Sequence, residues 1–538
     1  MKNAKRAAAL ILAASLAILP AGCKDDKSSE SATATTTAAA TTAATSADAG
    51  STTTKATSAS NSASAANSNA GSNLPALPNI RKSAKVYNTP ADKKRPSDSF
   101  IKSVKGYTLK IKHPWNFGGK AGTSSSSLGN YKTAIKYVKD TYGATIEEIG
   151  VFQDYNKILQ GEISANKFEY QMYEVQSFNF ASYIKNNYMK NLRSAQNIAA
   201  INFTEAWYDF NNTQIAAING GQYGWTSFDA EYTLPAGILY NKKLIKAANL
   251  TDPIVAARKG QWTWDTFESY ALKLTTSSTP GFRIAAKDGP VLLSSLMSAM
   301  GTNLVELKKG SAPKSNITSQ AGRDALAKIE TWVKKKAVVF NADEDWAANK
   351  KLFADGKVAM TLASHDTLNL CTGSAVKNSI GIVPFPSKSA SKTYKSVQDV
   401  QFISFIPSYY NNDTEVAKML FLRDEEMRQL YRYREQMFVN SYKNYNLDND
   451  SMAMAYLIKY ASTDTSGVKY GKYVSAVSIL DPDGSDADGM PNLTKIVHPV
   501  FKGAAASKQI SSYGAALQKK YDSLWGSKVF TGNYNYNK

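Results

Sequence analysis

The chain has little cysteine and little histidine. Its 538 residues include two cysteines, Cys23 and Cys371, and three widely separated histidines, His113, His365 and His498. Cys23 ends an export signal described below, so Cys371 has no partner for a disulfide, and we expect it to be a buried, inert thiol. A disulfide scaffold and a cysteine-based metal site are therefore excluded, and we predict no cofactor.

The sequence also lacks the motifs of common enzyme classes. It contains no Gly-x-Ser-x-Gly elbow, no His-Glu-x-x-His metal site and no phosphate-binding glycine loop. Glu147 and Glu148 could form a glycosidase pair, but adjacent acids on a strand point to opposite faces. We predict that the protein is not an enzyme and has no catalytic residue. The alternatives are a secreted or surface carbohydrate-active enzyme and a polymer-binding adhesin.

An acid-rich segment, Asp481 to Gly489, is the one candidate for a cation site. Its acids do not follow the spacing of an EF-hand loop, so we interpret it as a solvated turn and predict no metal site. The chain as a whole is basic, because 64 Lys and Arg residues outnumber 44 Asp and Glu residues. The lysines are scattered, which favours a basic surface facing an anionic cell envelope over a nucleic-acid site.

Residues 1–22 have the pattern of a secretory signal peptide. Cations within the first six residues precede an apolar stretch at 7–19 that is too short to span a bilayer permanently. The string LPAGC that ends at Cys23 resembles a bacterial lipobox, except that Pro20 stands where leucine is usual. The resemblance implies lipidation of Cys23 and a place on the extracellular face of the cell membrane. Ordinary cleavage and release of the chain is the alternative.

A long polar segment follows the signal peptide. Residues 24–74 are dominated by Ser, Thr, Ala, Asn and Gly, which cannot bury enough apolar surface to offset the entropy of ordering. We predict a lipid-anchored, disordered tether over 23–104, and a folded body that begins near Lys105. A coil of about 50 residues has a reach of roughly 40 Å.

Strand and helix patterns alternate in the folded body. We predict a strand, a helix, a strand, a helix and a strand at 107–112, 131–142, 145–152, 154–160 and 168–175. This order predicts a mainly parallel sheet flanked by helices. Ligands bind at the carboxyl ends of strands in such sheets, so the loops that start at His113, Gln153 and Gln176 are expected to hold one.

A second unit of the same kind follows, as expected for a chain too long for one core. We predict strands at 238–240, 357–363 and 379–385 and helices at 264–274 and 326–336. Asn241 and Thr263 are the expected N-caps of two helices.

Four segments of the second unit are similar to signature segments of a known family. They are LYNKKL at 239–244, GQWTWDTF at 260–267, FADGKVAMT at 353–361 and GIVPFP at 381–386. In this order, and behind an export signal, they resemble the bacterial extracellular solute-binding proteins of family 1, which include maltose and oligosaccharide binders. Physically, most of these residues are expected to be structural: Trp264 and Phe267 as core, Gly356 as a helix end and Met360 as a packed strand residue.

The resemblance implies an α/β clamshell of the periplasmic-binding-protein type, in which each lobe is a mainly parallel sheet flanked by helices. One lobe would comprise 105–230 and 395–430, and the other 231–394 and 431–538. Chain crossings are expected near 225–235 and 392–401, where glycines at 220, 221, 224 and 237 would permit hinge rotation. The implied protein is a monomer that captures a mono- or oligosaccharide and delivers it to the membrane permease of an ABC transporter.

A sugar presents flat C–H faces and hydroxyl edges, so its site needs aromatic platforms and planar polar groups. Residues of these types at strand ends and at the first crossing are the candidate ligand contacts: Trp115, Asn116, Gln153, Asp154, Trp225, Tyr232, His365 and Asp366.

Overall fold

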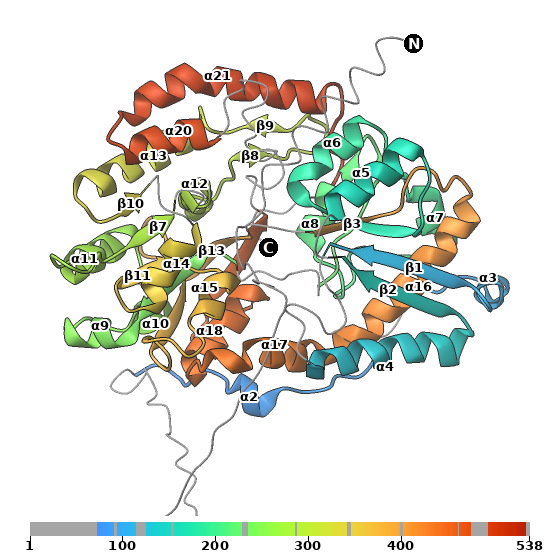
Figure 1. Cartoon of the computed structure of the whole chain (residues 1–538), viewed down its shortest axis with the longest axis horizontal. Coiled ribbons are helices and arrows are strands. Elements are labelled where there is room, and N and C mark those ends of the chain that lie inside the picture. Colours follow the sequence, from blue (N-terminus) through green and yellow to red (C-terminus); the bar gives the residue numbers. More distant parts are fainter. Residues whose placement is uncertain are drawn as a thin grey trace, which may run out of the picture. The chain divides into compact units, whose positions relative to one another are not determined.

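Strand and helix alternate along the folded body as predicted. It starts with β1 (Thr108–His113), α4 (Ser125–Tyr142), β2 (Thr145–Gly150), α5 (Tyr155–Ala165) and β3 (Met172–Gln176) (Figure 1). The computed structural model describes residues 73–90, 94–114, 125–151, 155–228, 235–285, 288–341, 346–398, 402–460, 462–474 and 493–533. They belong to one unit that spans residues 66–538.

The first sheet has the strand order β14-β3-β1-β2, where β14 is Phe402–Phe405. β1 runs parallel to β2 and β3, whereas β14, which arrives from the second half of the chain, runs antiparallel to β3. Leu109 and Ile146 are aligned in the register and both are buried. Helices cover this sheet: α5, α4, α6 (Phe180–Lys185), α7 (Arg193–Ile198), α8 (Phe210–Ile215) and α16 (Asp413–Leu430).

The second sheet is centred on β6 (Gly237–Asn241). This strand pairs antiparallel with both β11 (Met360–Leu362) and β12 (Ile380–Pro384). β7 (Arg283–Ala285) runs parallel to β10 (Val339–Asn341) and, through a bridge from Phe282 to Met360, to β11. All strands of this sheet except β6 therefore run the same way. Each sheet has one reversed strand, β14 or β6, because that strand enters from the other lobe.

Helices make up most of the rest of the second lobe, including those predicted at 264–274 and 326–336. They are α9 (Lys242–Ala247), α10 (Pro253–Arg258), α11 (Trp264–Leu274), α12 (Gly289–Ala299), α13 (Gln320–Lys334), α14 (Trp346–Ala354), α15 (His365–Leu370), α18 (Asn449–Lys459), α20 (Leu493–Phe501) and α21 (Ala506–Trp525). The side chains of Asn241 and Thr263 accept hydrogen bonds from the first turns of α9 and α11, as expected of N-caps. Trp264, Phe267 and Met360 are buried, as predicted.

The two crossings of the chain lie side by side. Antiparallel bridges join Trp225 to Ser404 and Ala236 to Val397, and the hydroxyl of Thr226 donates to the carbonyl of Phe402 at 3.0 Å. A third segment joins them, since β15 (Lys469–Val474) pairs in parallel with β13 (Thr393–Gln398). The crossings are thus joined through β14 of the first sheet and through β13 and β15, which belong to neither of the two main sheets.

Glycines at the crossing have a packing role in this structure. A Cβ at Gly224 would lie 2.7 Å from the carbonyl oxygen of Ser404, and one at Gly237 would lie 2.5 Å from that of Val383. Real Cβ contacts are longer than this, so the two glycines allow neighbouring strands to approach.

Residues 73–90 form what we call the N-terminal strap, and the predicted start of the folded body near Lys105 is too late. Leu77 and Ile80 are each only 4% exposed. The Arg258 guanidinium donates to the carbonyl of Pro75, and Arg428 donates to that of Pro90. The sequence pattern does not predict the strap, because its Pro- and Lys-rich residues have little propensity for helix or strand. Its stability comes from contacts with residues far away in the chain.

The remaining elements of the fold are short helices, turns and strands. The strap contains α2 (Ile80–Ser83) and leads to α3 (Asp98–Ser103), and α17 (Arg434–Tyr442) follows a short turn, η3 (Tyr431–Tyr433), after α16. The small strands are β4 (Ala217–Ile218), β5 (Gly221–Gln222), β8 (Val305–Glu306) and β9 (Lys314–Ser315), and the short helical turns are η1 (Ser177–Asn179) and η4 (Lys443–Tyr445). Among the helices of the described residues, none has the length and apolar character needed to cross a membrane.

Candidate ligand site and family

The carboxyl ends of the strands in both sheets lie next to the chain crossings. In the first sheet, His113 and Gly150 are aligned at the ends of β1 and β2, and Gln176 at the end of β3 is aligned with Phe402 at the start of β14. The chain reaches β14 from the second lobe through the crossing near residues 392–401. The edge of the first sheet at which β14 begins therefore faces the second lobe.

The second sheet has the matching arrangement. Leu362 at the end of β11 pairs with Ile238, and Pro384 at the end of β12 pairs with Gly237, where β6 begins. β6 is entered from the other crossing. The carboxyl edges of both sheets are therefore turned toward the same crossings, the position at which open α/β sheets bind ligands.

Most of the predicted ligand contacts fall outside the described residues. This is the case for Trp115, Asn116, Gln153, Asp154 and Tyr232, as well as for the lipidation site Cys23 and the acidic turn from Asp481 to Asp488. They stay predictions.

Backbone alone is described for two further candidates, His365 and Asp366. They form the first turn of α15, which directly follows β11, and Ser364 caps that helix by accepting from the backbone N–H of Thr367. The chain therefore brings both residues to the carboxyl edge of the second sheet, and their contact with a ligand stays a prediction.

Trp225 is the candidate whose side chain is described. It is 1% exposed, and its ring stacks on that of Phe203 with centroids 5.9 Å apart. Its backbone N–H donates to the carbonyl of Ser404 across the crossing. In this structure Trp225 packs within the first lobe, and its contact with a ligand stays a prediction.

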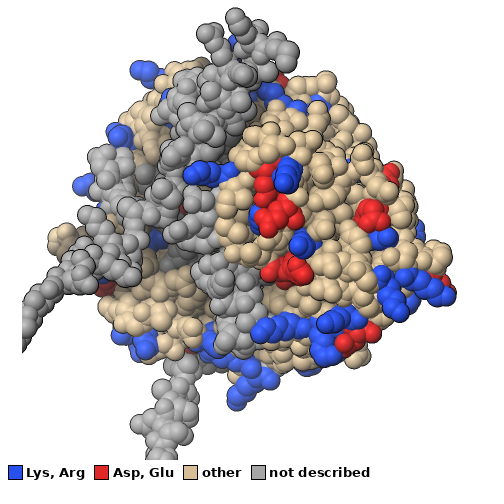
Figure 2. Space-filling view, turned by 45° about the vertical axis from the view of Figure 1, so that its right-hand side comes forward, with Lys and Arg blue, Asp and Glu red and all other residues tan. Residues whose placement is uncertain are grey.

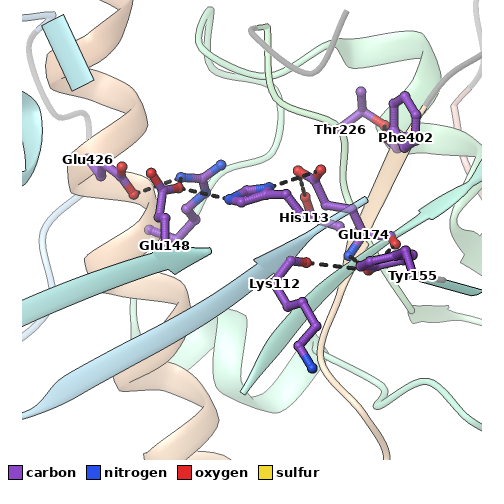
Figure 3. Close-up of polar contacts among 10 residues, drawn as sticks. Lys112, His113, Glu148, Tyr155, Glu174, Thr226, Phe402 and Glu426 are labelled. Carbon is purple, nitrogen blue, oxygen red and sulfur yellow. Dashed lines mark hydrogen bonds and ion pairs between the residues drawn. The ribbon is translucent and has the colours of Figure 1, made fainter. Parts of the chain in front are cut away.

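A buried ionic network, which the sequence did not predict, lies directly beneath the edge of the first sheet (Figure 3). His113 is fully buried, with Nε2 at 3.1 Å from Oε1 of Glu148 and Nδ1 at 3.0 Å from Oε2 of Glu174. Arg423 of α16 donates to Glu148 at 2.8 Å and to Glu426 at 2.7 Å. The network therefore links β1, β2 and β3 to the helix behind them.

The charges of this network follow from its geometry. Burial opposes protonation of His113, but the Glu174 carboxylate and the hydrogen bond to Glu148 dominate and raise its pKa to about 10. Burial likewise works against ionisation of Glu148, yet the Arg423 and His113 charges lower its pKa below the ordinary value. His113 is therefore a cation with both ring nitrogens engaged, and it cannot act as a general base.

Further hydrogen bonds hold Glu174 in place. The hydroxyl of Tyr155 donates to the Glu174 carbonyl at 2.6 Å and accepts from its N–H at 3.1 Å, while Ser404 of β14 donates to its carboxylate at 3.4 Å. Burial and the Glu174 charge raise the Tyr155 pKa well above its usual value, so this hydroxyl stays neutral. These contacts hold Glu174 between β1, the helix α5 and β14.

The sequence held a partial signal for this network. The strand pattern predicted that Glu147 and Glu148 point to opposite faces, and the structure confirms it: their side chains are 56% and 8% exposed. The sequence did not show that the side chains of His113, Glu148 and Glu174, from three neighbouring strands, would meet in one cluster. Within the described residues, no group of three or more His, Cys, Asp or Glu side chains is arranged to hold a metal ion.

Two α/β sheets whose carboxyl edges face a shared set of crossings define the two-lobed fold of periplasmic-binding-type proteins, and solved structures agree. The sugar-binding protein MalE of Xanthomonas citri superimposes with a TM-score of 0.54 at 10% identity, over 78% of this chain and 97% of that one. The galacto-N-biose/lacto-N-biose I-binding protein of Bifidobacterium longum gives 0.53 at 11% identity, over 78% and 96%. A tagatose-bound ABC transporter solute-binding protein from Thermotoga lettingae gives 0.50 at 16%, over 77% and 100%.

The sequence itself places the chain in a family. Residues 119–451 match the family model described as bacterial extracellular solute-binding protein, and the chain belongs to that family. Among curated proteins, none matches this chain. The resemblance noted from the four signature segments is thus confirmed at the level of the family. Because the solved structures share only 10–16% sequence identity with this chain, their similarity shows the fold alone.

Proposed function

We propose that this protein is a lipid-anchored solute-binding protein that captures a mono- or oligosaccharide outside the cell and delivers it to the permease of an ABC transporter. The observation that carries the proposal is that the carboxyl edges of both sheets are turned toward the same crossings. Membership of the solute-binding family and the sugar ligands named for the structures of similar fold support the same conclusion.

In this proposal the ligand lies between the lobes, which we assign to 105–230 with 395–430 and to 231–394 with 431–538. Trp115, Trp225 and Tyr232 supply aromatic surface, and Asn116, Gln153, Asp154, His365 and Asp366 supply polar contacts. The ion network of the first sheet supports the proposal because it joins the ends of the three strands that face the second lobe. We expect a monomer with no catalytic activity.

A panel of saccharides tests the proposal by thermal shift and calorimetry, with amino acids and short peptides as controls. A sugar that binds the folded state raises the melting temperature by mass action, by an amount that grows with its concentration. Trp115→Ala should lower the affinity at least tenfold, because the loss of a buried aromatic anchor costs about 2 kcal/mol or more. Tyr409→Ala removes a tyrosine that is 49% exposed beyond the other end of the sheet and is the matched control.

Two outcomes contradict the proposal. One is stabilisation by peptides or amino acids and by no saccharide. The other is hydrolysis of a saccharide during the titration. Anchoring is checked separately, by incorporation of labelled fatty acid into the chain and its loss in Cys23→Ser.

A further inference from the structure

A row of lysines runs along one side of the first lobe. Lys132, Lys136 and Lys139 are spaced by four and three residues on α4, so they lie on one face of that helix. All three are exposed. The row ends at Gly143, where the helix stops with a φ of +66°.

The connection before β1 extends the row. The side chain of Lys105 packs against Gly143, 3.1 Å from where a Cβ of that glycine would lie, and the N–H of Gly106 donates to the Gly143 carbonyl. Lys102 lies one turn earlier, at the end of α3. We call Lys102, Lys105, Lys132, Lys136 and Lys139 the α3–α4 lysine stripe.

The stripe has an excess of positive charge that the folded chain does not neutralise. Lys136 pairs with Asp140 on the same helix. The other four lysines form no ion pair with an Asp or Glu of the described residues. Figure 2 shows basic side chains gathered along the lower edge of this face, with few acidic ones among them. Such a surface favours an anionic partner.

The course of the N-terminal strap bears on which anionic partner, a membrane or a soluble polyanion, would lie near the stripe. In the strap, α2 packs against α17 and α18, and α17 packs against α4. The strap, α17 and α4 lie along the same side of the unit in Figure 1. The chain enters the folded unit beside the second lobe, where Arg258 and Thr465 donate to the carbonyls of Pro75 and Ala76. The strap then passes α17, which packs against α4, so the tethered protein has its stripe within reach of the membrane that holds the anchor.

We propose that the α3–α4 lysine stripe is a docking surface for anionic phospholipid headgroups, by which the protein rests on its membrane with the α4 side of the first lobe against the lipid. Its orientation in the cell rests on the proposed lipid anchor, whereas the attraction to anionic lipid does not. Each lysine close to an anionic surface strengthens binding about fivefold, and the effect is screened within roughly 8 Å at physiological salt.

The test uses the chain without its predicted signal peptide, residues 23–538 with Cys23→Ser, which cannot be acylated, and measures cosedimentation with vesicles. Phosphatidylglycerol mixed with phosphatidylcholine is compared with phosphatidylcholine alone, at low and at physiological salt. We expect binding to the anionic vesicles only, weakened by salt. The triple variant Lys105→Gln, Lys132→Gln, Lys139→Gln should lose about a hundredfold in partitioning.

The matched control removes the same charge elsewhere. Lys246, Lys273 and Lys308 are exposed lysines of the second lobe without an ion pair among the described residues, and their change to Gln should leave partitioning within about fivefold of the parent chain. Equal losses in the two triple variants would overturn the proposal, because only total charge would then matter. So would stronger retention on soluble polyphosphate than on anionic vesicles, since the partner would then be a polyanion.

Saccharide binding of the same variants separates this proposal from the proposed function. The stripe variant should show the thermal shift of the parent chain with any saccharide that binds. If vesicle binding fails while saccharide binding persists, the docking surface alone is refuted. If saccharide binding fails while vesicle binding is lost only in the stripe variant, the docking surface stands and the proposed function is refuted.

Discussion

His113 shows how much a single residue in this protein depends on its neighbours. It is fully buried, and both of its ring nitrogens face carboxylates that are themselves held by Arg423, Tyr155 and Ser404. A buried charge is costly unless it is paired and hydrogen-bonded, so removal of one member leaves the others uncompensated.

The first prediction concerns this residue. His113→Gln should lower the free energy of unfolding by about 3–5 kcal/mol at neutral pH, measured by denaturant unfolding, because Glu174 would be left as a buried and unpaired anion. Glu147→Gln, which removes the neighbouring exposed acid, is the control and should cost no more than about 1 kcal/mol.

A comparison of the parent chain with His113→Gln at several pH values tests the charge of His113. Its pKa is raised to about 10 in the folded state, whereas an unfolded histidine has a pKa of about 6.5. The contribution of His113 is therefore complete below about pH 6.5 and is lost as the pH rises toward 10. The stability difference between the parent chain and His113→Gln should narrow over that range. A difference that stays constant would mean that His113 is neutral.

At the scale of elements, two of the signature segments meet in the second sheet. Gly381 on β12 pairs with Tyr240 on β6, and a Cβ on Gly381 would lie 1.9 Å from the Tyr240 ring. The Tyr240 hydroxyl donates to Asp252 at 2.5 Å, and Asp252 caps α10. The glycine of the GIVPFP segment therefore makes room for the tyrosine of the LYNKKL segment, which in turn fixes a helix.

The second prediction follows from this contact. Gly381→Ala should destabilise the protein by about 1–3 kcal/mol, as expected when a methyl group is forced into a packed core, and thermal unfolding measures it. Gly129→Ala is the matched control, since a Cβ there meets nothing within 4 Å and the residue lies inside α4. That change should be neutral or stabilise by about 0.5–1 kcal/mol.

At the scale of the whole molecule, motion of the lobes has to pass through the crossings. The bridges between Trp225 and Ser404 and between Ala236 and Val397, together with the pairing of β13 and β15, tie the crossing segments to one another. The strap adds a further tie, because it bonds to Arg258 beside the second sheet and to Arg428 of α16. Hinge closure is thus expected to bend a small group of strands as one unit.

The third prediction concerns closure. Small-angle scattering of the full chain should show a smaller radius of gyration when a stabilising saccharide is bound, since a clamshell compacts when its lobes close. A saccharide that gives no thermal shift is the control and should leave the scattering unchanged. An unchanged radius of gyration at saturation would point to a rigid binding surface, as in a polymer-binding adhesin.

Sequence pattern alone determined the strand and helix order, the N-caps at Asn241 and Thr263, the structural roles of Trp264 and Met360, and the family. These depend on interactions between residues a few positions apart, which leave a periodic or local signature. Even so, the strand predicted at 168–175 begins later, at Met172, because the preceding residues turn before they pair.

Only the tertiary structure decided the burial of the N-terminal strap, the reversed strands β6 and β14, and the ion network of His113. Each depends on partners distant in the chain: Leu77 packs in a core built from later residues, and Arg423 reaches Glu148 across 275 positions. Such contacts have no local period. Their free energy exists only once the chain has brought the partners together.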